Sequence, residues 1–271
     1  MPIKKKDNQI NNNPVCLITG ASKGLGLGLI KQFAQNGYTV IGCGRSKLDE
    51  ETTRTLNSLN SKPIYLQCDI TKSDDVETLF KNIEHQFGKI DVVINNAGGA
   101  EKFGSFLELS EEDWKNSLEL NLISVVRITK RAIPLLKKST RARIINICST
   151  SAIMPGYFNP HYSAAKAGML NLNKHLSNVL AEDNILVNAI NLGPTKTDSW
   201  KKNTENLAQV NNTTVEMADQ LLTDQEKAKI PLKCLGNTDD VGHLALFLAQ
   251  ETTTWLTGAS INLDGGKYRG L

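Results

Sequence analysis

The sequence has 271 residues, of which 40% are hydrophobic and 22% are charged, as in an ordinary globular protein with a sizeable core. Its formal net charge of +3 is too small to indicate binding to nucleic acid or to a membrane surface. The chain contains neither an uncharged run of about 18 residues that would span a membrane nor the apolar stretch of a secretory signal.

The first 13 residues, MPIKKKDNQINNN, are polar, and we expect them to form a disordered tail. From residue 14 onward, short apolar runs alternate with longer segments of helical periodicity. Strands are predicted at 15–19, 39–43, 63–68, 91–95, 143–148, 185–190 and 260–264. Helices are predicted at 24–36, 73–87, 111–137, 162–182 and 239–250. Ser110 and Asp113 form a predicted capping box, and Thr238 is the predicted cap of the last helix.

The predicted strands are apolar with little alternation, which is typical of parallel strands buried on both faces. Because they alternate with helices through short links, we expect a doubly wound parallel α/β sheet in a single domain, residues 14–271. The segment at about 195–232 breaks this alternation. It is too long for an ordinary connection and is mostly polar with scattered apolar residues, so we predict a substrate lid there.

Five cysteines are scattered along the chain without a C-x-x-C pair. An odd number of this kind indicates free thiols in a reducing compartment, so we expect a cytoplasmic protein. The four histidines show no metal-ligand spacing, and no metal site is expected.

Two short motifs carry candidate chemistry. The run TGASKGLG (19–26) follows the first predicted strand and opens the first predicted helix, so its glycines allow a tight turn and its helix N-terminus suits a diphosphate. In YSAAKAG (162–168), Tyr162 and Lys166 are four residues apart and share one face of a helix. Alone, this second motif is more often an exposed helix than a site.

The motifs become specific when they are taken together and in order. The chain resembles the short-chain dehydrogenase/reductase family from about residue 14 to 266, in TGASKGLG (19–26), NNAG (95–98), Asn121 in LNLISV, Ser149 in NICSTS, YSAAK (162–166) and NLGPTKT (191–197). The resemblance implies a Rossmann-type sheet of about seven strands and a nicotinamide cofactor. It also implies a homodimer or homotetramer, paired through the helices at 111–137 and 162–182.

The family pattern implies a catalytic tetrad of Asn121, Ser149, Tyr162 and Lys166. Tyr162 is expected to exchange a proton with the substrate oxygen, and a nearby ammonium such as that of Lys166 is expected to lower the pKa of the phenol. Lys166 is also expected to bond the nicotinamide ribose, Ser149 to hold the carbonyl oxygen, and Asn121 to bend its helix and order a water. We expect Cys148 to be a buried thiol.

The resemblance to the family also implies contacts with the cofactor. In the glycine turn they are Gly20, Ser22, Lys23, Gly24, Leu25 and Gly26. Elsewhere they are Asp69, Ile70, Asn95, Ala97, Gly98, Gly193, Thr195 and Thr197, together with Tyr162 and Lys166. The family usually has Pro-Gly where this chain has Leu192-Gly193-Pro194, a departure that affects the contacts expected for the carboxamide.

The loop at 42–47, GCGRSK, favours NADP(H) over NAD(H). Gly44 stands where an NAD enzyme would carry an acidic residue for the ribose 2′-hydroxyl. Arg45 follows, and its guanidinium suits a 2′-phosphate, with Lys23 and Ser46 as additional partners.

The sequence therefore predicts an NADP(H)-dependent oxidoreductase that reduces a ketone or 3-oxoacyl group to a secondary alcohol. We expect a small-molecule carbonyl or alcohol substrate, with an apolar or acyl body that contacts the lid. One alternative is an NAD-dependent alcohol or polyol dehydrogenase. Another, of a different class, is a non-catalytic dinucleotide-binding sensor or scaffold. His161, which immediately precedes Tyr162, is expected to lie at the surface.

Overall fold

The computed structural model describes residues 13–59 and 61–270. Apart from residue 13, the predicted N-terminal tail therefore lies outside the described residues. Seven parallel strands form one sheet in the order β3-β2-β1-β4-β5-β6-β7. They are β1 (Val15–Thr19), β2 (Thr39–Gly44), β3 (Ile64–Gln67), β4 (Val92–Asn95), β5 (Arg143–Ser149), β6 (Leu186–Leu192) and β7 (Ser260–Leu263). The predicted doubly wound sheet is confirmed.

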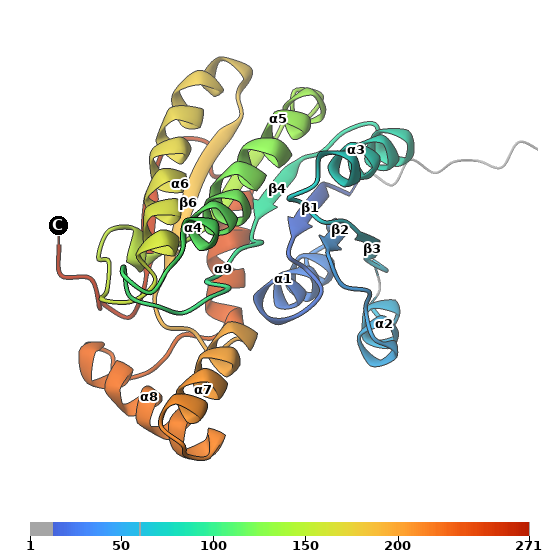
Figure 1. Ribbon diagram of the computed structural model, residues 1–271. Helices are drawn as coiled ribbons and strands as arrows, with labels where there is room; N and C mark the ends of the chain where they lie inside the picture. Colours follow the sequence, from blue (N-terminus) through green and yellow to red (C-terminus); the bar gives the residue numbers. More distant parts are fainter. Residues whose placement is uncertain (1–12, 60, 271) are drawn as a thin grey trace, which may run out of the picture.

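Helices cover both faces of this sheet (Figure 1). They are α1 (Gly24–Gln35), α2 (Glu50–Asn57), α3 (Ser73–Phe87), α4 (Glu111–Leu118), α5 (Ser124–Leu136), α6 (Pro160–Val179), α7 (Asp198–Val210), α8 (Val215–Lys229) and α9 (Thr238–Ala249). One apolar core joins the sheet to α3, α5 and α6, and a second joins it to α1, α2 and α9. Among the residues that the structure describes, no helix is long and apolar enough to cross a membrane.

The predicted helix at 111–137 is interrupted. It begins at the predicted capping box, where Asp113 N donates to Ser110 Oγ (3.2 Å) and Ser110 N donates to Asp113 Oδ2 (2.8 Å). It then passes through a π-helical turn, Glu119–Ile123, before α5 continues. A π turn widens the backbone by one residue and re-aims the side chains within it. This π turn contains Asn121, where the sequence predicted a bend.

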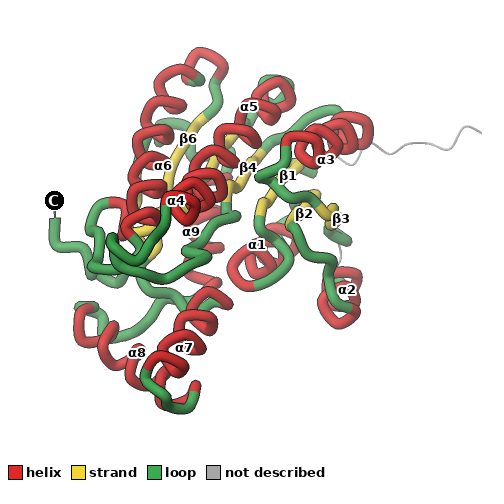
Figure 2. Tube along the Cα trace, in the orientation of Figure 1, coloured by secondary structure: helices red, strands yellow, loops and turns green. Residues whose placement is uncertain are grey.

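Three sequence expectations differ from the structure. Helix α2 was not predicted, since only Leu56 is buried on it and the apolar period is therefore too weak to recognise. The cap of α9 is Asn237, not Thr238, because the Asn237 side chain accepts from two backbone N–H groups of the first turn. The predicted lid contains two helices, α7 and α8, which project together from the layered core (Figures 1 and 2).

Buried asparagines connect the centre of the sheet to α6. Asn95 Nδ2 donates to Asn146 Oδ1 (2.8 Å), and Asn146 Nδ2 donates to Asn173 Oδ1 (3.0 Å). Asn173 Nδ2 then donates to the carbonyl of Ala259 (3.2 Å), just before β7. All three amides are buried. This amide chain, Asn95–Asn146–Asn173, joins β4, β5 and α6, because each buried polar group needs the next as its partner.

The amide chain yields a stability prediction. Asn146→Leu keeps the side-chain size but removes an acceptor from Asn95 and a donor from Asn173. We expect a loss in the free energy of unfolding of about 1–3 kcal/mol for each of these two buried groups. Urea denaturation measures it, with Asn116→Leu on exposed α4 as the control, expected within about 0.5 kcal/mol of the parent. An equal loss in the free energy of unfolding in both variants would contradict a stabilising role for the Asn146 hydrogen bonds.

Candidate active site

The end of β1 and the start of α1 are joined by the predicted glycine turn. Gly20 and Gly24 have positive φ angles of 67° and 54°, which glycine adopts without strain. A Cβ on Gly20 would lie 2.7 Å from the Cα of Ala97, so only glycine permits this close approach. The N-cap of α1 is Lys23, whose side chain has no acceptor, so the first-turn N–H groups remain available to an anion. These residues fit the diphosphate of a dinucleotide.

Leu25 and Gly26 lie in the first turn of α1, and Ser22 lies just before it. A Cβ on Gly26 would lie 2.2 Å from the carbonyl oxygen of Gly20, so the first turn of α1 packs directly against the backbone at the end of β1. At the end of β4, Ala97 N and Asn96 N both donate to Thr19 Oγ1 at 3.0 and 3.1 Å. The turn after β1 is therefore held against the loop after β4.

Asn121 and Lys166 meet at Gly98. Asn121 Oδ1 accepts from Gly99 N (2.8 Å), and its Nδ2 donates to the carbonyls of Gly99 (3.1 Å) and Ser117 (3.0 Å). A Cβ on Gly98 would lie 2.7 Å from Asn121 Oδ1 and 3.2 Å from Lys166 Nζ. The π turn thus brings Asn121 to the backbone after β4, beside the buried lysine.

The Lys166 side chain is buried against β5. Its Nζ donates to the carbonyl of Ile147 (2.9 Å) and lies 3.6 Å from Met169 Sδ. Burial lowers the pKa of Lys166, while the buried Cys148 thiol opposes this change. Cys148 Sγ in turn contacts the carbonyl of Lys166 at 3.3 Å, and burial raises its pKa. Cys148 is therefore a buried thiol, as expected.

Tyr162 and Ser149 lie together at the carboxyl edge of the sheet. Burial raises the pKa of Tyr162 to about 12, Cys148 acts in the same direction, and a hydrogen bond with the Ser149 side chain opposes the rise. Lys166 Nζ lies 5.8 Å from the centre of the Tyr162 ring. The pKa is raised, whereas the sequence predicted a lowered value, because the effect of burial is larger than that of the hydrogen bond with Ser149. Ser149 Oγ also accepts from Ser151 Oγ (2.9 Å).

The loop after β2 carries the residues expected to select the cofactor. Gln67 Nε2 donates to the carbonyl of Arg45 (2.8 Å), and Tyr65 Oη donates to the carbonyl of Ser46 (2.6 Å). A Cβ on Gly44 would lie 2.8 Å from Tyr65 Oη, so a side chain at position 44 would have to displace the Tyr65 hydroxyl. The Arg45 guanidinium is exposed and forms an ion pair with Glu101 (2.8 Å).

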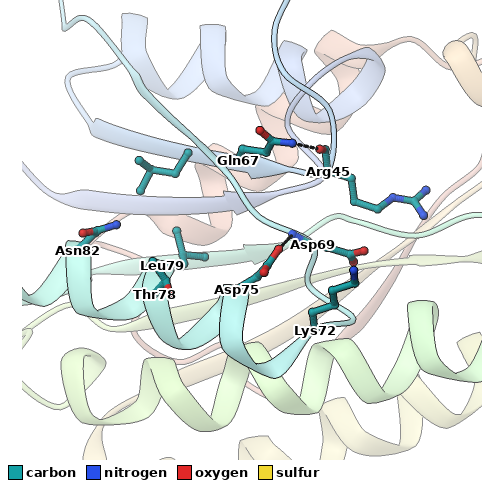
Figure 3. Close-up of a pocket in the computed structure, with 9 residues that line it drawn as sticks. Arg45, Gln67, Asp69, Lys72, Asp75, Thr78, Leu79 and Asn82 are labelled. Carbon is teal, nitrogen blue, oxygen red and sulfur yellow. Dashed lines mark hydrogen bonds between the residues drawn. The ribbon is translucent and has the colours of Figure 1, made fainter.

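Arg45 and Asp69 line a cavity of about 450 Å³ between β3 and α3 (Figure 3). Asp69 Oδ1 accepts from Thr71, and the Asp69 backbone N donates to Asp75 Oδ2 (2.9 Å), so the turn after β3 is well fixed. The Ile70 side chain is buried in the core below. Of the two residues expected at the adenine, only Asp69 lines this cavity.

The Asn95 side chain, at one of the expected cofactor contacts, is buried and belongs to the amide chain. At the other end of the site, Gly193 approaches β7 closely, since a Cβ there would lie 2.7 Å from Asp264 Cα. Thr195 Oγ1 donates to the carbonyl of Gly193 (3.0 Å), and Thr197 is the N-cap of α7.

His161 lies in the interior, contrary to the expectation of a surface residue. It is 1% exposed, and its ring packs edge-on against Trp114 with centroids 6.1 Å apart. Its Nδ1 has no partner among the described residues. Burial lowers the pKa of His161 and Lys102 acts in the same direction, while the Asn159 backbone and the Asp113 charge oppose the shift.

Some residues that contact the site could not be identified from sequence motifs. Glu101, Met169 and the carbonyl of Ile147 were not singled out in the sequence, although each contacts a predicted site residue. Asn146 did give a signal, since it is a polar residue within the apolar run RIINIC. In the part of the chain that is described, no group of three or more His, Cys, Asp or Glu side chains is placed to hold a metal ion.

Comparisons with known proteins agree with this geometry. The sequence model for short chain dehydrogenases matches residues 14–208. The 3-oxoacyl-[acyl-carrier-protein] reductase of Staphylococcus epidermidis is 30% identical over 258 residues, which cover 94% of this chain and 99% of that protein.

Two solved structures are similar over nearly the whole chain. L-sorbose reductase from Gluconobacter frateurii, complexed with NADPH and L-sorbose, has a TM-score of 0.87 and 27% identity, covering 96% of this chain and 98% of that one. An actinorhodin polyketide ketoreductase variant with NADPH has a TM-score of 0.85 and 28% identity, covering 96% and 99%.

The buried imidazole of His161 predicts a pH dependence of stability. Its folded pKa lies below the unfolded value of 6.5, so as the pH falls through 6.5 the unfolded chain gains a proton that the folded chain does not. His161→Phe removes this penalty and keeps a ring beside Trp114. We expect the variant to gain stability relative to the parent between pH 7.5 and pH 5.5, measured by urea denaturation. His85→Phe, at an exposed position on α3, is the control. A difference that does not change with pH would refute this account.

Proposed function

Because the chain belongs to the short-chain dehydrogenase family, we propose that it is an NADP(H)-dependent reductase that converts a ketone or 3-oxoacyl group to a secondary alcohol. The observation that carries the proposal is the convergence of four side chains at one edge of the sheet. Asn121 and Lys166 meet at Gly98, and Tyr162 and Ser149 meet at the end of β5. A non-catalytic sensor would have no need for this complete set.

The protonation state of Tyr162 suits the role of proton donor. With its pKa raised to about 12, the phenol is protonated at neutral pH. It is therefore ready to donate a proton to a carbonyl oxygen that becomes an alkoxide. Ser149, which contacts the phenol, would hold that oxygen in place. The glycine turn would hold NADPH, whose nicotinamide would supply the hydride. Because Tyr162 would exchange the same proton in either direction, the choice of reduction rests on the proposed NADP(H) cofactor.

Several contacts support NADP(H) as the cofactor. Position 44 is a glycine, so the acid that would repel a 2′-phosphate is absent, and a side chain there would have to displace the Tyr65 hydroxyl. A Cβ on Gly44 would lie 3.5 Å from Ser22 Oγ, so the glycine turn and the loop after β2 adjoin. Exposed Lys23 and Arg45 extend from these two adjoining loops, and both suit a phosphate.

We propose that residues 195–232 act as a lid built from α7 and α8. The two ends of the segment lie together, since Gly236 N donates to the carbonyl of Pro194 and Lys196 N donates to that of Gly236, both at 3.0 Å. Within it, Trp200 Nε1 donates to Asp219 Oδ1 (2.6 Å), which joins the two helices into one unit. A narrow neck and a rigid helical pair are what a moving lid requires.

The surroundings of the site support a substrate with an apolar or acyl body. Asn159 N donates to the carbonyl of Gly104 (2.9 Å), so two loops lie together beside the start of α6. These loops expose large apolar side chains, namely Phe103, Phe106, Leu107, Met154, Tyr157 and Phe158. The relatives named above reduce, by their names, both acyl and sugar substrates, so the choice depends on this chain's own loops.

We also propose that the chain forms a homodimer or homotetramer. The π turn and α6 expose Ile123 and Val179, and Phe247 and Trp255 are exposed near β7. Apolar side chains of this size at a surface favour association with another chain.

Tyr162→Phe tests the proton donor. Removing the hydroxyl leaves the ring packing unchanged, so we expect kcat for ketone reduction to fall about 10²–10⁴-fold while the Kd for NADPH changes little. Tyr38→Phe is the matched control, because its hydroxyl bonds the carbonyl of Ala249 away from the site. Steady-state kinetics with a panel of ketones, 3-oxoacyl thioesters and sugars, together with cofactor titration, measure both quantities. A variant with half the parent activity would exclude Tyr162 as the donor.

The cofactor preference has its own test. We expect kcat/KM to be at least tenfold higher with NADPH than with NADH, because each charge-assisted contact to the 2′-phosphate contributes about 1.5–3 kcal/mol. Arg45→Ala should lose most of this preference, whereas Lys47→Ala, two residues along the same exposed loop, should keep it. Equal kcat/KM values for the two cofactors in the parent protein would favour an NAD-dependent dehydrogenase.

A further inference from the structure

Arg45 forms an ion pair that crosses the entrance to the proposed cofactor groove. It lies just after β2, whereas its partner Glu101 lies in the loop after β4. In the sheet order, β2 and β4 flank β1 on opposite sides. The 2.8 Å contact between Arg45 Nη2 and Glu101 Oε1 therefore spans the end of β1, where the glycine turn begins.

This ion pair can exchange partners. The two side chains are 58% and 49% exposed, and exposed pairs of this kind are weak. The Arg45 backbone is fixed by Gln67, so the guanidinium is the part that can turn. A phosphate dianion offers more charge and more acceptor oxygens than a carboxylate, so it would displace Glu101 from the guanidinium.

Glu101 does not leave the groove when it is displaced. Asn121 holds the backbone of Gly99, two residues before Glu101, through hydrogen bonds of 2.8 and 3.1 Å. The neighbouring Lys102 is engaged with Asp113 (2.9 Å) and is not directed to Glu101. The carboxylate therefore remains near the site, where it repels any group of like charge.

We propose that Glu101 is a specificity-determining residue, an internal carboxylate that competes with the 2′-phosphate of NADP(H) for Arg45. The inference rests on the proposed cofactor and goes beyond it: Arg45 favours the phosphate, and Glu101 limits how strongly. NAD(H), which has no 2′-phosphate, leaves the Arg45–Glu101 pair intact. Glu101 thus affects one cofactor and not the other.

The test uses two small probes that differ only in the 2′-phosphate, adenosine 2′,5′-bisphosphate and adenosine 5′-phosphate. Calorimetry at one fixed ionic strength gives their Kd values for the parent, Glu101→Gln, Arg45→Ala and the double variant. We expect Glu101→Gln to bind the bisphosphate about two- to fivefold more tightly, the effect typical of an exposed ion pair, and the monophosphate unchanged. Glu112→Gln, at an exposed position on α4, removes the same charge elsewhere.

In the Arg45→Ala background, Glu101→Gln should no longer tighten bisphosphate binding, since the competition needs the guanidinium. A gain that persists there, or that Glu112→Gln reproduces, would show a general charge effect and overturn the proposal. A parent that prefers the bisphosphate, with no change in Glu101→Gln, would overturn this proposal alone. No preference in any variant would overturn both this proposal and the NADP(H) assignment. A preference that appears only in Glu101→Gln would support the competition and contradict the assignment.

Discussion

A buried ammonium group sets the position of the helix that carries the proposed chemistry. Lys166 is 3% exposed, and a charge so far from water is tolerated only with good partners. Its Nζ bonds the carbonyl of Ile147, and its own carbonyl accepts from the thiol of Cys148. These two contacts lock α6 to β5 in one register. Because Tyr162 lies one helical turn before Lys166, the same register places it beside Ser149.

The same lysine constrains the loop after β4. Gly98 approaches both Lys166 and Asn121, and no side chain fits between them. Asn121 reaches this loop only because the chain departs from α-helical geometry at Glu119–Ile123. The helix loses its regular α-helical hydrogen bonds in this turn, and the buried side-chain amide of Asn121 forms hydrogen bonds with the backbone of Gly99. A break in a helix, a glycine and a buried charge are therefore parts of one arrangement.

The sequence anticipated elements whose pattern is local. All seven strands lie within two residues of their predicted bounds, because strands buried on both faces are continuous apolar runs. Helices α7 and α8 were not anticipated as helices, since Trp200 and Ala218 are buried while neighbouring apolar residues are exposed, which weakens the period. The burial of His161 depends on Trp114, and the pairing of Arg45 depends on Glu101, 56 residues away. Contacts between such distant residues have no periodic signature.

The buried amide chain has an evolutionary consequence. An apolar trio at Asn95, Asn146 and Asn173 would bury no polar group and so need not be less stable than the amides. Each single replacement, however, leaves a neighbouring amide without its hydrogen-bond partner. Any series of single substitutions from the three amides to the three apolar residues therefore passes through less stable intermediates. The effects of the three positions are therefore strongly epistatic. Once the three asparagines are present, single substitutions at these positions are selected against. We therefore expect related sequences to keep all three or to replace all three together.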